Sequence, residues 1–242
     1  MADPPRFATA PDHVRALDFG HVLVLINYRT GRVQCLRPDA AAFWHGAAAT
    51  GRLETVPTAL STRLLADGLL SPSTTPTPWP APLRAKAATA SWGSTEHDAG
   101  AVRPTPSRGT ATAAAALATV LALKRLGSSS TALRRITTTL AKAASTCRHP
   151  ATHDQATAAV RAVRRAGWYS PARTACLEES AATVLLLASR GLSVTWCHGV
   201  APDPVRLHAW VQTDDGNPVA EPPSTLAYTP ALTIGGHHQH RL

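Results

Sequence analysis

A stretch rich in proline, serine and threonine divides this chain of 242 residues and most constrains its fold. It runs from Ser71 to Arg108 and includes Ser-Pro-Ser-Thr-Thr-Pro-Thr-Pro-Trp-Pro and Arg-Pro-Thr-Pro-Ser. With few apolar residues at any regular period, it buries too little surface to order itself, and its prolines favour an extended, semi-rigid conformation. We therefore predict folded domains at residues 1–72 and 111–236, a linker at 73–110 and a disordered tail at 237–242.

The segment before the linker has the pattern of three strands and two helices. A strand is expected at 15–19, and the apolar runs 21–27 and 32–36, joined by a turn at 28–31, indicate a β-hairpin. Pro38-Asp39 opens an alanine-rich helix, and a second helix is expected at about 55–67, with Val56, Leu60 and Leu64 on one face. This unit is small, so we expect it to depend on the rest of the chain or on a ligand.

The segment after the linker changes from helices to strands. Helices are expected at 111–126, 131–144 and 155–166, and a fourth, capped by Ser170-Pro171, is expected to run through Cys176 to Arg190. Strands follow at 192–197, 206–213, 218–220 and 231–234, with a hairpin turn at 214–217. Helices followed by an antiparallel sheet predict the α+β class.

Composition and charge limit the classes of partner and the cellular location that we expect for this protein. The 24 Lys and Arg against 15 Asp and Glu give a net charge of +9, which suits nucleic acid, an anionic surface or an acidic peptide. Many of the arginines lie on alanine-rich helices, where we interpret them as solvated faces: Arg134, Arg135, Arg161, Arg164 and Arg165. No apolar run reaches the roughly 18 residues of a membrane span, and the N-terminus lacks a signal pattern. We expect a cytoplasmic protein with no membrane or nucleic-acid partner.

The C-terminal half contains the residue types of cysteine catalysis. Cys176 lies early in a helix, where unpaired N–H groups and the helix dipole favour a thiolate. His208 lies on a strand, with Trp210 on the same face, and is a candidate base. Glu221 follows across the hairpin and is a candidate to orient the imidazole; Asp214 and Asp215 in the turn are rival carboxylates. Each of these residues also has an ordinary structural interpretation.

The other candidates for chemistry are weaker. Cys197-His198 and the histidines at 237–240 lack a spaced partner set, so we predict no metal and no cofactor. Cys35 and Cys147 have no evident base nearby in the sequence. In a reducing compartment the four cysteines are expected to be free thiols.

The C-terminal half also resembles the leader peptidase of lasso-peptide biosynthesis. The similarity spans about residues 110 to 236 and lies in five segments: Cys176-Leu177-Glu178-Glu179-Ser180, Arg190-Gly191-Leu192, Gly199-Val200, His208-Ala209-Trp210-Val211-Gln212 and Tyr228-Thr229-Pro230-Ala231-Leu232. This resemblance implies a transglutaminase-like cysteine protease domain in which Cys176 and His208 are catalytic. Ala220-Glu221 stands where the family usually has Asn-Asp, which implies Glu221 as the third residue. Asp203-Pro204 stands where Pro-Phe often precedes the histidine segment.

The N-terminal segment resembles a PqqD-like precursor recognition element. The similarity lies in Leu23-Val24-Leu25 and Thr30-Gly31-Arg32-Val33-Gln34-Cys35-Leu36. It implies a winged-helix-like domain that binds a leader peptide as an added strand beside its third strand and a helix. Val33, Cys35, Leu60 and Leu64 are then the candidates for the groove, with core packing as their alternative interpretation.

Together these resemblances imply a cysteine peptidase that binds a ribosomal precursor peptide, removes its leader and releases the core to a separate asparagine-synthetase-like cyclase. Three alternatives remain open. The chain could be a precursor-binding module with an inactive peptidase half, or it could transfer the acyl group to an amine. The third is a basic winged-helix DNA-binding protein, although nothing at base-reading positions supports it.

Overall fold

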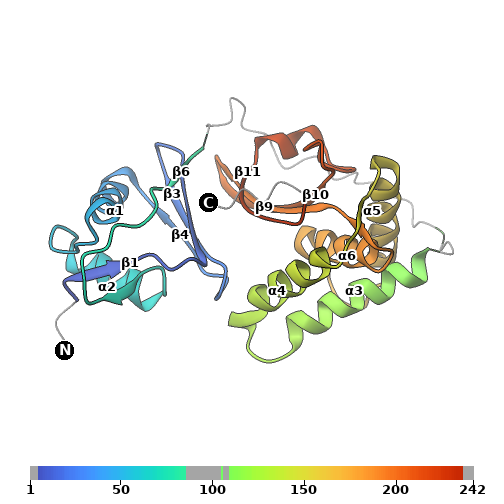
Figure 1. The fold of residues 1–242 in the computed structure, drawn as a ribbon, viewed down its shortest axis with the longest axis horizontal. Coiled ribbons are helices and arrows are strands. Elements are labelled where there is room, and N and C mark those ends of the chain that lie inside the picture. The colour runs from blue at the N-terminus through green and yellow to red at the C-terminus, as the bar shows by residue number, and fades with distance from the viewer. Residues whose placement is uncertain (1–4, 86–104, 106–108, 237–242) are drawn as a thin grey trace. The chain divides into compact units, whose positions relative to one another are not determined.

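The computed structural model describes residues 5–85, 105 and 109–236. Contacts within the chain define two units, Met1–Ala87 and Ala88–Leu242 (Figure 1). Both contain helices and strands, so the expected α+β class is confirmed. The rest of the expected linker, at 86–104 and 106–108, and the expected tail at 237–242 lie outside the described residues.

The first unit contains the strands and helices that the sequence predicts between residues 15 and 67. Its first three long strands form an antiparallel meander, and two helices follow it. The turn between the second and third uses Gly31 at φ 74°, a left-handed conformation that glycine adopts without steric cost. The elements are β1 (Phe7–Thr9), β2 (Val14–Asp18), β3 (Leu23–Asn27), β4 (Val33–Leu36), α1 (Pro38–Thr50), α2 (Thr58–Ala66), β5 (Ser71–Ser73) and β6 (Leu83–Arg84).

Residues 71–85 belong to this unit, although the sequence pattern placed the start of the linker at residue 73. β5 pairs antiparallel with β1, and β6 pairs parallel with β2. Between them Trp79 is only 7% exposed, and its ring meets that of Trp44 edge-on at 5.7 Å. Strands of two or three residues are too short to show an alternating pattern. Tertiary partners, and not local propensity, order this segment.

The core of the first unit joins alternate residues of the sheet to the two helices. Its large members include Leu23, Leu25, Leu36, Trp44, Leu64 and Trp79. Leu64, expected to line a peptide groove, is 1% exposed and thus follows the core-packing alternative. Leu60 is partly buried against the same core. Val33 and Cys35, the other two candidates for the groove, are exposed on β4.

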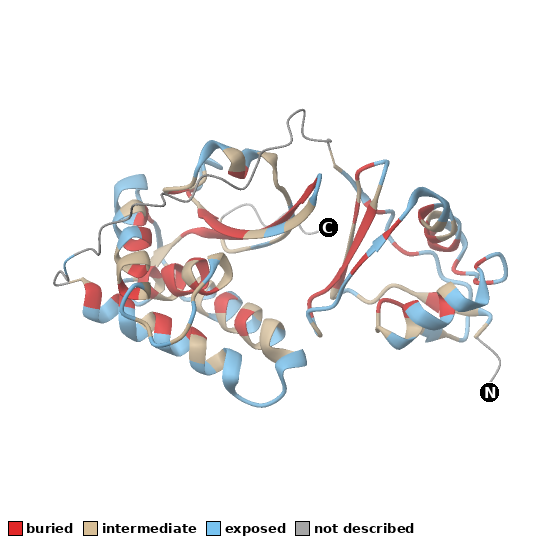
Figure 2. Cartoon of the chain, turned by 180° about the vertical axis from the view of Figure 1, so that it is seen from behind, coloured by how far each residue is buried: buried red, intermediate tan, exposed pale blue. Residues whose placement is uncertain are grey.

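The second unit begins with helices near the positions that the sequence predicts. They are α3 (Thr110–Arg125), the 3₁₀ turn η1 (Ser129–Thr131), α4 (Ala132–Ser145), α5 (His153–Gly167) and α6 (Cys176–Ala188). α6 packs against α3, α4, α5 and the sheet, and Figure 2 shows buried residues along most of its length. Each outer helix instead buries one stripe. Within the described part of the chain, no helix is long and apolar enough to cross a membrane.

The second half of this unit is an antiparallel sheet in the order β10-β9-β11. The expected strand 218–220 is reduced to one bridge, between Gln212 and Pro218, and one hydrogen bond from the Val219 N–H to the Val211 carbonyl. The expected strand 192–197 is divided, because β8 pairs with β7 and a separate strand starts at Thr195. The elements are β7 (His149–Pro150), β8 (Leu192–Ser193), β9 (Thr195–Pro202), β10 (Val205–Gln212), the 3₁₀ turn η2 (Pro223–Ala227) and β11 (Thr229–Ile234).

Trp79→Ala is expected to lower the unfolding free energy of the first unit by about 3 kcal/mol, because it opens a cavity beside Trp44. Hydrogen exchange of β2, β3 and β4 peptides in the full chain, followed by mass spectrometry, measures this change. Leu83→Ala is the control, since Leu83 lies in the same segment but is 47% exposed. Equal protection in the wild type and Trp79→Ala would mean that the segment does not support the fold.

Candidate active site

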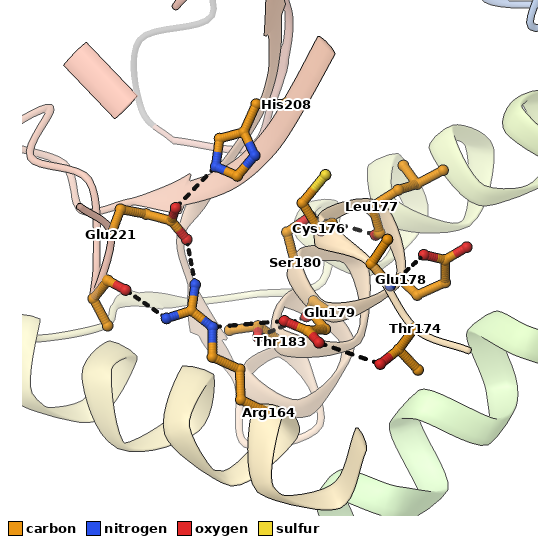
Figure 3. Close-up of polar contacts among 12 residues, drawn as sticks. Arg164, Thr174, Cys176, Leu177, Glu178, Glu179, Ser180, Thr183, His208 and Glu221 are labelled. Carbon is orange, nitrogen blue, oxygen red and sulfur yellow. Dashed lines mark hydrogen bonds and ion pairs between the residues drawn. The ribbon is translucent and has the colours of Figure 1, made fainter. Parts of the chain in front are cut away.

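The three residues predicted as a catalytic set lie together in the second unit (Figure 3). His208 Nε2 lies 2.8 Å from Glu221 Oε2. Cys176 lies near enough to the same imidazole to be among the groups that raise its pKa. The three side chains come from the start of α6, the middle of β10 and the segment that returns along β10. The topology thus assembles a thiol, an imidazole and a carboxylate.

Cys176 is the first residue of α6. The expected cap at Ser170-Pro171 is wrong: the helix starts after Ala175, whose backbone is extended, with φ −137° and ψ −177°. Alanine has no side chain that could cap the first amides. These amides, together with the positive end of the helix dipole, lie beside the sulfur. They can stabilise negative charge on the thiol or on an oxyanion formed next to it.

Buried polar groups fix the first turn of α6. Glu178 is 2% exposed, accepts a hydrogen bond from the Ala175 N–H at 3.0 Å and forms an ion pair with Lys124 of α3. Ser180 Oγ donates to the Cys176 carbonyl at 2.6 Å and accepts a hydrogen bond from the Trp196 indole at 2.9 Å. These contacts tie the cysteine to α3 and β9.

His208 packs against two aromatic rings, which also contact each other. It stacks on Trp210, with centroids 5.8 Å apart and planes at 12°, and Tyr228 packs against it at 5.1 Å. Gly199 lies opposite His208 in the register of β9 and β10. A Cβ on Gly199 would lie 2.6 Å from the Thr229 carbonyl oxygen and 2.8 Å from the Trp210 indole. Glycine therefore allows the sheet and the aromatic rings to approach this closely.

The environment of His208 favours the imidazolium. Burial lowers the pKa of His208, but hydrogen bonds to Cys176 and Glu221 and their negative charges raise it to about 9. Because Nε2 of His208 is hydrogen-bonded to Glu221, Nδ1 is the ring nitrogen that can face the Cys176 sulfur. By contrast, burial and the nearby charge of His208 lower the pKa of His198 to about 4. At neutral pH His208 is therefore charged and His198 is neutral.

Glu221 is the carboxylate beside the imidazole. Its side chain is 7% exposed, and Thr225 Oγ1 donates to Oε2 at 3.3 Å. Asp215, one of its rivals, instead accepts hydrogen bonds from Thr213 and Asn217 within the hairpin turn. This is the turn role that the sequence pattern also allowed for the aspartates.

The other three cysteines have different surroundings. Burial raises the pKa of Cys35 and Cys147, and it raises the pKa of Cys197 to about 12. Among the described residues, no group of three or more His, Cys, Asp or Glu side chains is placed to bind a metal. Cys176 is the cysteine whose neighbours suit nucleophilic chemistry.

Arg164 and Glu179 are site residues that the sequence interpretation missed. The expectation of a solvated Arg164 holds only in part: its side chain is 40% exposed, but its guanidinium contacts both Glu221 and Glu179. These three residues and Cys176 line a small pocket together with Val160 and Val211. The helical period of the sequence could have indicated this position, since Arg164 lies one turn after the buried Val160 and thus on the inward side of α5.

The titration of His208 should make stability depend on pH. Its pKa is about 9 in the folded chain and about 6.5 when unfolded, so its contribution is complete below pH 6.5 and is lost as pH rises through 9. The unfolding free energy should fall across this window by about 3 kcal/mol more in the wild type than in His208→Gln. Urea unfolding at a series of pH values measures the difference. Parallel curves for the two proteins would refute the raised pKa.

Comparison with known proteins agrees with this geometry. Residues 116–233 match a family model described as the transglutaminase-like superfamily, and this range contains Cys176, His208 and Glu221. Searches of curated proteins and of solved structures found no match. The second unit therefore contains a transglutaminase-like domain at residues 116–233.

Proposed function

We propose that this chain is a cysteine peptidase that binds a ribosomal precursor peptide and removes its leader during lasso-peptide biosynthesis. The contact of His208 with both Cys176 and Glu221, at the start of a helix, carries this proposal. The transglutaminase-like match supports cysteine-dependent acyl chemistry. The choice of a lasso precursor comes from the sequence resemblance described above. The same proposal places the protein in the cytoplasm and has the core peptide pass to an asparagine-synthetase-like cyclase.

The proposed reaction uses the three groups in turn. The Cys176 thiolate attacks the carbonyl carbon of the leader–core bond, and amides of the first turn of α6 receive the oxyanion. His208 gives its proton to the leaving amine, which releases the core peptide and leaves a thioester on Cys176. His208 then accepts a proton from water, which attacks the thioester and frees the leader. Glu221 orients the imidazole throughout.

Recognition of the leader is assigned to the first unit, as a PqqD-like element. Its four-stranded sheet has the order β4-β3-β2-β6, so β6 covers one edge and β4 forms the other. An extended peptide can add to such an edge through backbone hydrogen bonds. Val33 and Cys35 are exposed on β4 and suit side-chain contacts, and Leu60 on α2 is partly buried. Leu64 is left out, because it is enclosed in the core.

A second candidate is transfer of the acyl group to an amine, favoured by the match to a transglutaminase-like family. Both reactions pass through the same thioester, and they differ in whether water or an amine attacks it. An inactive peptidase half is less compatible with the site, since the charged His208 and its two partners form a complete set.

Cys176→Ala should abolish cleavage of a synthetic lasso precursor peptide that contains leader and core, because it removes the nucleophile, while leader binding persists. Mass spectrometry of the products distinguishes hydrolysis from amine transfer by the added mass of the amine. Cys147→Ala is the matched control and should cleave normally. Normal processing by Cys176→Ala would refute the mechanism.

In the wild type, kcat/KM should decline above pH about 9, where His208 loses its proton.

Leader binding should depend on β4. In the full-length Cys176→Ala chain, adding Val33→Asp or Cys35→Asp should raise the Kd for a fluorescent leader peptide about tenfold or more, because a charge replaces an apolar contact. Fluorescence anisotropy measures the Kd. Ala49→Asp, at an exposed position of α1, makes the same charge change away from β4 and should leave the Kd unchanged. Equal affinity in all variants would place recognition elsewhere.

A further inference from the structure

Arg164, near the end of α5, contacts three groups beside the active site (Figure 3). Its Nη2 donates to Glu221 Oε1 at 2.6 Å, and its Nη1 donates to the Ala220 carbonyl, also at 2.6 Å. Its Nε lies 3.6 Å from Glu179 Oε2 on α6. One guanidinium thus joins α5, α6 and the irregular segment after β10.

We propose that Arg164 is a positioning residue that holds the Glu221 carboxylate so that its other oxygen accepts the hydrogen bond of His208. The inference rests on the catalytic roles proposed above for Cys176, His208 and Glu221. Arg164 bonds one carboxylate oxygen, Oε1, while His208 bonds the other, Oε2. It acts through Glu221.

The backbone around Glu221 provides little support of its own. The last ladder bond before it is that of Val219, and the next residue, Ala220, has φ 51°. A left-handed conformation at a residue other than glycine costs about 1 kcal/mol. Pro222 follows Glu221 and has no N–H to donate. The bond from Arg164 to the Ala220 carbonyl therefore fixes the residue that directs Glu221 toward the histidine.

Charge is the second reason for an arginine at this position. Burial raises the pKa of Glu179, the nearby Glu221 charge raises it further, and Arg164 lowers it. Two carboxylates so close together repel each other unless a cation lies between them. Arg164 lies beside both carboxylates and offsets this repulsion. A lysine would supply the charge but not the planar fork that binds two acceptors at once.

Several segments contribute charged or titratable groups to the surroundings of His208: Cys176 from α6, His198 from β9, Arg206 from β10, Glu221 after the hairpin and Tyr228 before β11. His198 has a pKa of about 4, and burial raises the pKa of Tyr228, so both are neutral at neutral pH. Arg206 acts on Tyr228. Cys176 and Glu221 raise the pKa of His208 itself, so its titration reports the placement of Glu221.

The direction of the pKa change separates positioning from a simple charge effect. If Arg164 acted only as a nearby cation, Arg164→Met would raise the pKa of His208. If it holds Glu221, its loss should lower this pKa from about 9 by about one unit, in the same direction as Glu221→Gln. NMR titration of the full chain with labelled histidine measures it, with His208→Gln assigning the signal. The titration needs no substrate, so its result stands even if the proposed peptide is not cleaved.

Three further variants complete the test. The double variant Arg164→Met/Glu221→Gln should titrate like Glu221→Gln, because both changes remove one interaction. Arg164→Lys, which keeps the charge, should still lower the pKa and covers the case in which Arg164→Met fails to fold. Arg161→Met, at an exposed position on the same helix, should leave it unchanged. An unchanged or raised pKa in the Arg164 variants, or additive shifts in the double variant, would overturn the inference.

Discussion

The ion pair between the buried Glu178 and Lys124 is the constraint on which the arrangement of the site depends. A carboxylate that is 2% exposed is costly unless it is paired and hydrogen-bonded. Lys124 and the Ala175 N–H meet that requirement, and in doing so they determine where α6 begins. The first residue of the helix is then Cys176. Packing of α6 against β10 brings His208 to the same end of the helix.

The sequence predicted the features that depend on local patterns of residues. Helical and alternating periods gave most of the helices and the central strands, and residue types together with the family resemblance pointed to Cys176, His208 and Glu221, which lie together in the structure. Features that depend on distant partners were missed. Trp79 lies in a segment whose composition resembles a linker, yet it packs against Trp44. The start of α6 was placed at Ser170-Pro171, because the stabilising partner of its first turn, Lys124, is 54 residues from Glu178. Arg164 was interpreted as solvated for the same reason.

The sheets of the two units differ in a way that suits different tasks. In the second, β9 is buried along its whole length between β10 and β11, which gives His208 a rigid support. In the first, β6 covers one edge of the sheet while β4 remains at the other. A rigid sheet suits chemistry that requires fixed distances, and an uncovered strand suits binding of an extended chain. This division agrees with the proposal that recognition and cleavage are performed by separate parts of one polypeptide.

The different surroundings of the four cysteines also affect how the protein responds to its chemical environment. Partial desolvation raises the pKa of Cys35 and Cys147, and burial raises that of Cys197, whereas Cys176 lies beside a charged imidazole. Peroxide and soft electrophiles react with thiolates in preference to thiols. Oxidative damage should therefore begin at Cys176, the proposed nucleophile, while the fold remains intact. The same selectivity would let a covalent probe count the working sites in a preparation without any need for the natural substrate.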